Sequence, residues 1–268
     1  ILPVPSRTYI INLTRRSERR DMMERLRKML GVEWEYFPAT ESANPIVGQI
    51  ISGVNTPVSL PFEWPVDDGR APVVPFEDGK GIAPYDDKMD PLLCSTGAFD
   101  LTPYSFNPTE QCTLTPGRIA CYHSHYSAIQ HAASAAVPHV ALFLEDDIDV
   151  ESDIQERLAS VWEYLPEDWD MLFLGHCWSD ETHHGVLGPP SPEATTHLRP
   201  SNAPLCTHAY ALSPKGLERI TRDLAHPSLA YSRPIDTVFR FLIQNGRLNS
   251  FSITPSIVVQ RKDDMSDV

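Results

Sequence analysis

The sequence predicts an α/β fold in which helices flank a mainly parallel sheet. Short segments rich in β-branched and aromatic residues alternate along the chain with segments whose apolar residues recur at helical spacing. The chain has 268 residues, of which 41% are apolar and 22% charged. That composition is typical of a globular protein large enough for one substantial core. We therefore expect a single domain over 1–268, interrupted by one irregular segment.

The first expected elements are a strand, a helix and a second strand. Residues 8–13 read TYIINL, a pattern typical of a short buried strand. In 17–30 the apolar residues fall on one helical face, and Gly31 is a residue that commonly ends a helix. Apolar and acidic residues alternate over 32–36, which predicts a half-buried strand.

An interruption follows at 42–116. This segment holds 11 of the 25 prolines and reads as poor in strands. A structureless loop of this length is uncommon inside a compact domain. We therefore expect an irregular but ordered insertion or lid, for which Cys94 and Cys112 offer a disulfide.

Strands and helices alternate again after the insertion. Thr115 and Pro116 are a favourable N-cap and first residue for a helix that ends near residue 136. A strand over 139–144 then runs directly into three acidic residues. The other expected elements are a helix around 154–165, a strand at 169–174, a polar loop to 204, a strand at 206–212, helices from 214 and over 233–244, and strands at 248–254 and 257–260.

The charge of the chain argues against two classes of partner. The 22 basic and 36 acidic residues give a net charge of −14 at pH 7. A negative field of that size repels nucleic acid and anionic lipid, and no segment reads as a membrane span. Seven basic residues nevertheless cluster between Arg15 and Lys28. This cluster suggests a local anion site in an acidic protein.

The cysteines and the first residue bear on the compartment. Five cysteines, an odd number with no CxxC pair, leave at least one thiol free. A disulfide in the insertion would favour an oxidising compartment. The chain begins with Ile1 rather than Met, so we expect a processed form whose signal or anchor has been trimmed. We expect the secretory pathway, in the lumen of the endoplasmic reticulum or Golgi, with the cytoplasm as the alternative.

The clearest chemical signal is the acidic run that follows the strand at 139–144. Ligands of open α/β sheets bind beyond the carboxyl ends of the strands, where Glu145, Asp146 and Asp147 would lie. Clustered carboxylates repel one another unless a cation neutralises them, and hard oxygen ligands favour Mg²⁺ or Mn²⁺. An equally good reading is a solvated acidic turn before a helix.

A second strand end offers a place for an anion. Asn12, Leu13, Arg15 and Arg16 follow the first strand and lead into a helix, whose free N–H groups and arginines suit a phosphate. An exposed basic first turn is the plainer reading. Together, the acidic and basic strand ends match the needs of a nucleotide-diphosphate pocket.

Zinc and serine hydrolase chemistry fit the sequence less well. Cys121 and His125 can share a helix face at i,i+4, but no run has the paired spacing of a structural zinc site. The chain also lacks the GxSxG turn of a serine hydrolase.

Six segments in order resemble glycosyltransferase family 25, which includes collagen galactosyltransferases and bacterial lipopolysaccharide sugar transferases. They read YIINLTRRSERR, GRIACYHSH, LFLEDDI, WDMLFLG, THAYALSPKGL and PID, and they span nearly the whole chain except the insertion. The resemblance implies a GT-A fold, related to the Rossmann fold, and a UDP-sugar donor used with Mn²⁺ (or Mg²⁺). Two departures are the Gly117-Arg118 pair, where the family usually has Gly-Glu, and the insertion itself.

The resemblance also implies roles for single residues. The donor nucleotide would lie beside Asn12, Leu13, Arg15, Arg16, Ala39, Thr40, Ser124, Glu145, Asp146 and Gln260. Asp147 would bind the metal, and Glu145 would contact either the metal, through a water, or the ribose. His125 completes the family's Ser-His pair and is either a packed helix residue or a catalyst.

Asp236, in the PID segment, is the candidate general base, although a first-turn aspartate of a helix would look the same. We expect transfer of a hexose, galactose or glucose, from a UDP-sugar to a hydroxyl of a glycan or glycoprotein. The family resemblance implies inversion. The alternatives are a pseudoenzyme that binds a sugar nucleotide without turnover and a metal-dependent phosphohydrolase.

Overall fold

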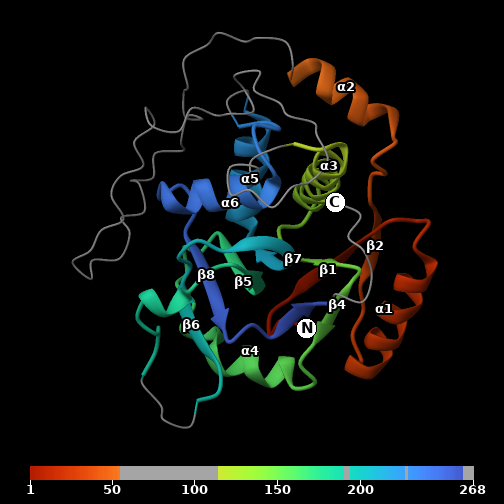
Figure 1. Cartoon of the computed structure of the whole chain (residues 1–268). Coiled ribbons are helices and arrows are strands. Elements are labelled where there is room, and N and C mark those ends of the chain that lie inside the picture. The colour runs from red at the N-terminus through yellow and green to blue at the C-terminus, as the bar shows by residue number, and fades with distance from the viewer. Residues whose placement is uncertain (55–113, 190–193, 227–228, 262–268) are drawn as a thin grey trace.

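A computed structural model describes residues 1–54, 114–189, 194–226 and 229–261 (Figure 1). Its centre is a seven-stranded sheet of order β2-β1-β3-β7-β5-β8-β6, beside which a two-stranded sheet pairs β4 with β9. The strands are β1 Ser6–Asn12, β2 Glu35–Pro38, β3 Val140–Glu145, β4 Ile148–Val150, β5 Met171–Cys177, β6 His197–Pro200, β7 Leu205–Leu212, β8 Ser250–Thr254 and β9 Val258–Gln260.

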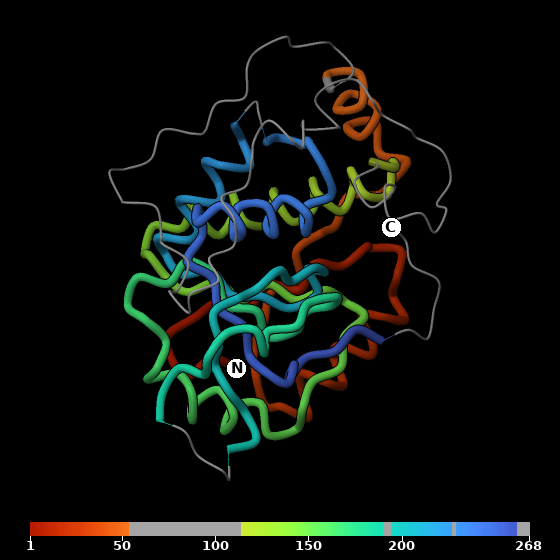
Figure 2. The backbone as a smooth tube through the Cα atoms, turned by 60° about the vertical axis from the view of Figure 1, so that its left-hand side comes forward, coloured from red at the N-terminus to blue at the C-terminus, as the bar shows by residue number. Residues whose placement is uncertain are grey.

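Helices cover both faces of the sheet. They are α1 Ser17–Leu30, α2 Pro45–Val54, α3 Pro116–Ala133, α4 Ile154–Trp162, α5 Pro214–Ala225 and α6 Ile235–Gln244, with a 3₁₀ turn, η2, at Glu181–His183. Figures 1 and 2 show α3, α5 and α6 on one face and α1 and α4 on the other. The predicted α/β fold with flanking helices is confirmed.

The sheet is mixed. Strand β1 pairs in parallel with β2 and β3, and β5 pairs in parallel with β8, whereas β7 is antiparallel to both β3 and β5, and β6 is antiparallel to β8. The reversal of β7 places its first residues at the sheet edge where β3 and β5 end.

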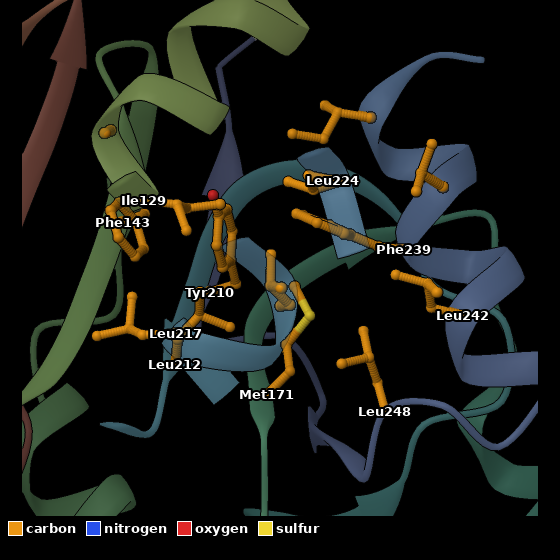
Figure 3. Close-up of a cluster of buried hydrophobic side chains, with 14 of the residues drawn as sticks. Ile129, Phe143, Met171, Tyr210, Leu212, Leu217, Leu224, Phe239, Leu242 and Leu248 are labelled. Atoms are coloured by element: carbon orange, nitrogen blue, oxygen red, sulfur yellow. The ribbon is translucent and has the colours of Figure 1, made fainter. Parts of the chain in front are cut away.

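The pleat of the central strands divides the core into two parts. Successive side chains of a strand point to opposite faces. Thus Tyr9, Phe143 and Tyr210 pack under α3, α5 and α6, as Figure 3 shows for the last two, while Ile10 and Leu144 pack against α1 and α4. Burial on both faces explains why these strands read as short, nearly continuous apolar runs.

Two helix ends, the start of α3 and the end of α1, follow the predicted residues, whereas α4 ends at Trp162 and α3 at Ala133, each three residues earlier than predicted. The Thr115 side chain accepts a hydrogen bond from the Arg118 N–H at 3.2 Å, with Pro116 as the first helical residue of α3. Gly31 ends α1 with a left-handed φ of 61°.

Some predictions for the connecting segments need revision. Helix α2 lies within 42–116, the segment predicted to be irregular, because Pro45 starts a run of apolar residues at helical spacing. The polar loop expected before residue 204 contains η2 and the strand β6. A disulfide joins Cys177, at the end of β5, to Cys206 in β7, with a Cα–Cα distance of 5.6 Å. The expected pairing of Cys94 with Cys112 lies outside the described residues.

Within the described part of the chain, no helix combines the length and the apolar character needed to cross a membrane.

Candidate active site

A pocket opens where β1, β2 and β3 end. Its position follows from the parallel pairing of these strands, whose carboxyl ends share one sheet edge. The lining residues are Ile11, Leu13, Arg15, Arg19, Ala39, Thr40, Glu41, Ser42, Gly117, Ala120, Cys121, Ser124, His125, Glu145, Asp146, Asp147 and Gln260. Most of the predicted site residues therefore come together in one cavity.

Asp146 is the structural member of the acidic run. Its two carboxylate oxygens accept hydrogen bonds from Asn12 Nδ2 at 2.7 Å and from Arg19 at 3.0 Å. Burial raises its pKa, although these two hydrogen bonds act in the opposite direction. Asn12 is itself buried and does not line the pocket. Asn12 therefore holds the Asp146 carboxylate in place from outside the pocket.

Asp147 keeps one oxygen free of hydrogen bonds. Its Oδ2 accepts from Arg19 and from Gln260 Nε2, each at 3.2 Å. Its Oδ1 is buried and has no hydrogen-bond partner among the described residues. Burial, together with the charge of Glu145, raises the pKa of Asp147 to about 6. A buried acceptor without a donor is costly, so this oxygen marks a place for a cation or a donor group.

Glu145 is held by hydrogen bonds at the end of β3. The Thr207 hydroxyl donates to its Oε1 at 2.8 Å, and Nε2 of His125 lies 3.3 Å from the same oxygen. Burial on its own would raise the pKa of Glu145, but hydrogen bonding by His125 and Thr207 and the nearby imidazoles bring it below its ordinary value. The other nitrogen of His125, Nδ1, is hydrogen-bonded to the Tyr210 hydroxyl at 2.9 Å.

The opposite wall of the pocket is built from the segment after β2. The Ala39 N–H donates to the Asn12 carbonyl at 2.9 Å, which extends the β1–β2 pairing into the pocket. The Thr40 N–H donates to Ser124 Oγ at 2.8 Å, so Ser124 ties this segment to α3. Arg15 lines the mouth of the pocket and pairs with Glu41 at 2.8 Å. Its neighbour Arg16 lies outside the lining and pairs with Glu18 at 3.2 Å.

Asp236 lies beyond the lining residues, in the first turn of α6. Its carboxylate accepts hydrogen bonds from the N–H of Cys206 at 3.2 Å and from the N–H of Thr237 at 2.7 Å. Its charge reaches the pocket, because it contributes to raising the pKa of the Cys121 thiol, which burial raises most. Asp236 therefore contacts the start of β7 and its own helix, and it acts on Cys121 through its charge.

The most important residue missed from the sequence is Arg19. Its guanidinium is buried and contacts both Asp146 and Asp147. A signal was present, because Arg19, Met23 and Leu26 share the buried face of α1 at spacings of four and three residues. A charged residue on an otherwise apolar stripe requires a buried partner. Thr207, which orients Glu145, carried no comparable signal.

Comparison with known proteins agrees with this architecture. A sequence model of glycosyltransferase family 25 (LPS biosynthesis protein) matches residues 6–186. The chain is 28% identical over 162 residues to "Probable inactive glycosyltransferase 25 family member 3" of Bos taurus, covering 59% of this chain and 26% of the relative. It is 30% identical over 141 residues to "Inactive glycosyltransferase 25 family member 3" of Homo sapiens, covering 51% and 22%.

A third relative is described without the word inactive. The chain is 27% identical over 172 residues to "Glycosyltransferase 25 family member" of Aedes aegypti, covering 63% of this chain and 21% of the relative. The chain thus aligns with only about a quarter of the length of these curated relatives. The family match covers well over half of the chain and implies a GT-A-like fold. This chain belongs to glycosyltransferase family 25.

Proposed function

We propose that the pocket binds a UDP-sugar with a divalent metal and that the protein transfers the hexose to a hydroxyl acceptor. The observation that carries the proposal is the buried Oδ1 of Asp147, an acceptor without a donor among the described residues, in a pocket that also contains Glu145. In a family of nucleotide-sugar enzymes, such an oxygen fits a metal that accompanies the donor diphosphate.

The residues present fit Mn²⁺ or Mg²⁺. Asp147 offers Oδ1 and Glu145 offers its second carboxylate oxygen, whereas both oxygens of Asp146 are already bonded to Asn12 and Arg19. One or two carboxylates, with phosphate and water as the other ligands, are the usual ligand set for these ions in nucleotide sites. When bound, the metal stabilises the negative charge of the departing UDP as a Lewis acid.

The remaining lining residues suit the nucleotide. Leu13, Ala39 and Thr40 form the wall next to the ends of β1 and β2, where the uridine fits, and Gln260 flanks Asp147 from β9. Arg15, at the mouth, supplies a positive charge for the diphosphate.

Asp236 is the proposed general base. Two backbone N–H groups fix the orientation of its carboxylate, and its charge acts on Cys121 in the pocket lining. A carboxylate in that position accepts the proton of the acceptor hydroxyl as the oxygen attacks the anomeric carbon, and the bond to UDP breaks. Direct displacement inverts the anomeric centre. Galactose and glucose are the proposed sugars, and a glycan or glycoprotein is the proposed acceptor.

Two rival functions use the same site. The names of the bovine and human relatives call those proteins inactive or probably inactive, and a sugar-nucleotide-binding pseudoenzyme would keep the pocket without turnover. The retained acidic run and Asp236 favour an active enzyme over this rival. A metal-dependent phosphohydrolase would use the same carboxylates but would not need the nucleotide wall.

The disulfide supports a secretory location. Disulfides persist in the endoplasmic reticulum and beyond it, and they are rare in the cytosol. The Cys177–Cys206 bond is therefore consistent with the proposed lumen of the endoplasmic reticulum or Golgi.

Calorimetric titration of UDP tests the donor site. We expect binding that requires Mn²⁺, is abolished by a chelator, and weakens about tenfold or more in Asp147→Asn. Asp149→Asn is the matched control, because Asp149 lies two residues away, is 53% exposed and pairs with Arg261 rather than with the pocket. Absence of UDP binding, or binding indifferent to both Mn²⁺ and Asp147, would contradict the donor site. Release of phosphate from simple esters without UDP binding would identify the hydrolase instead.

Turnover separates the enzyme from the pseudoenzyme. UDP release from UDP-galactose or UDP-glucose, in the presence of acceptor glycans, is expected for the wild type. Tight Mn²⁺-dependent UDP binding without release from any donor would favour the pseudoenzyme.

A further inference from the structure

Two groups of three metal-ligating side chains occur in the part of the chain that the structure describes. One contains Cys177, Cys206 and His208, but its two sulfur atoms are joined in a disulfide and are not available as thiolates. In the other group, one ligand atom each from Cys121, His125 and Glu145 lies within 4.8 Å of the other two. Only the second group contains a free thiol beside an imidazole and a carboxylate.

The fold presents these three ligands together. Cys121 and His125 are four residues apart on α3 and therefore share a helix face, and Glu145 ends the strand β3 beside them. The Tyr210 hydroxyl, 2.9 Å from Nδ1 of His125, holds the ring with Nε2 toward Glu145. A hydrogen bond at the far nitrogen is the usual way in which proteins orient a metal-binding imidazole.

The surroundings of the thiol favour a cation. Burial raises the pKa of Cys121, and the negative charges of Glu145, Asp236 and Asp147 raise it further. The same charges that oppose a lone thiolate attract a divalent ion, which would displace the thiol proton to solvent on binding. The three ligands also line the open pocket, so a fourth ligand such as water can reach the ion.

We propose that Cys121, His125 and Glu145 form a second metal site, selective for thiophilic ions such as Zn²⁺, within the donor pocket. Sulfur and imidazole ligands select Zn²⁺ over Mn²⁺ and Mg²⁺, and three protein ligands with one open position are a common zinc arrangement. Glu145 would serve both sites, so Zn²⁺ withdraws it from the Mn²⁺ site and competes with the nucleotide sugar. The competition rests on the proposed function, whereas the binding of Zn²⁺ does not.

Cobalt provides a direct test of the ligand set without nucleotide. Co²⁺ bound to a thiolate absorbs in the near ultraviolet by charge transfer, and Zn²⁺ displaces it. Cys94 and Cys112, which lie outside the described residues, are replaced by serine in every protein, and the Cys177–Cys206 disulfide is kept. We expect one equivalent of Co²⁺ to give the charge-transfer band. Cys121→Ser should remove the band and weaken Zn²⁺ binding about tenfold or more.

Asp147→Asn separates this proposal from the proposed function. Asp147 is not a ligand of the second site, so this variant should keep the cobalt band even where Mn²⁺-dependent UDP binding is lost. Stoichiometric Zn²⁺ should weaken Mn²⁺-dependent UDP binding in the wild type, and the same addition should change it less in Cys121→Ser. No charge-transfer band in the disulfide-intact protein, or a band that persists in Cys121→Ser, would overturn the metal site. An intact band with no effect of Zn²⁺ on UDP binding would overturn the competition.

Discussion

Replacing Asp147 by asparagine should stabilise the metal-free protein while it weakens the proposed donor site. Asp147 is largely shielded beside Glu145, with 16% of its side chain exposed, and its pKa is raised to about 6 from the ordinary value of 3.8. Folding therefore disfavours the ionised form of the Asp147 carboxyl group relative to its protonated form. Asparagine has nearly the same shape, can keep an oxygen toward Arg19 and Gln260, and carries no charge.

The pKa shift sets the size and sign of the effect. A carboxyl group whose pKa is higher in the folded than in the unfolded protein binds more protons when folded, so its ionisation lowers stability as pH rises. For Asp147 this loss occurs mainly between pH 4 and pH 6, the range spanned by its two pKa values. A shift of two pKa units corresponds to roughly 3 kcal/mol as an upper limit. We therefore expect Asp147→Asn to raise the free energy of unfolding by about 1–3 kcal/mol near neutral pH.

Urea unfolding in the presence of a chelator measures this effect. The stability difference between Asp147→Asn and the wild type should grow by about 1 kcal/mol between pH 5 and pH 7.5. Asp149→Asn, at an exposed carboxylate in the same acidic run, should show almost no difference at either pH. If Asp147→Asn is clearly less stable than the wild type at pH 7.5, its contacts with Arg19 and Gln260 outweigh burial, and the reasoning is refuted.

Three further predictions follow from other contacts. Arg19→Met leaves the buried Asp146 and the partly buried Asp147 without their guanidinium, so the free energy of unfolding in urea should fall by about 3–5 kcal/mol. An effect below 1 kcal/mol would show that the ion pairs matter little. Replacing both Cys177 and Cys206 by serine removes a disulfide that spans 29 residues, and the free energy of unfolding should fall by about 3 kcal/mol in the same assay. An unchanged unfolding midpoint would contradict a stabilising disulfide. Asp236→Asn should lower kcat by about 10²–10⁴ with UDP affinity nearly unchanged, measured by UDP release and calorimetry, whereas a retained kcat would exclude Asp236 as the base.

Local sequence patterns were enough to predict much of the fold. The central strands are buried on both faces and therefore appear as short apolar runs, and α1 and α3 end or begin at residues with a clear capping role. Strand direction was harder, because the reversal of β7 depends on how a polar connection crosses the molecule. Helix α2 was hidden by the prolines that surround it, although Pro45 is a normal first residue of a helix.

The candidate site was predictable from the sequence wherever its polar residues come directly after a strand. The carboxylates after β3 and the wall after β2 meet because parallel strands bring their ends to one edge. The contacts that assign different roles to Asp146 and Asp147 were not predictable. They come from Arg19, 127 residues earlier, and from Gln260, 113 residues later. No local pattern encodes a pairing over such distances.

The position of Gln260 has a consequence for the order in which the hydrogen bonds around the acidic run form during synthesis. Strand β9 carries Gln260. It pairs with β4, the strand that directly follows the acidic run. When the acidic run has been synthesised, the basic segment after β1 is already present, but Thr207 and Gln260 are not. The acidic loop is therefore incomplete until 113 residues beyond Asp147 have been added and β9 has paired with β4.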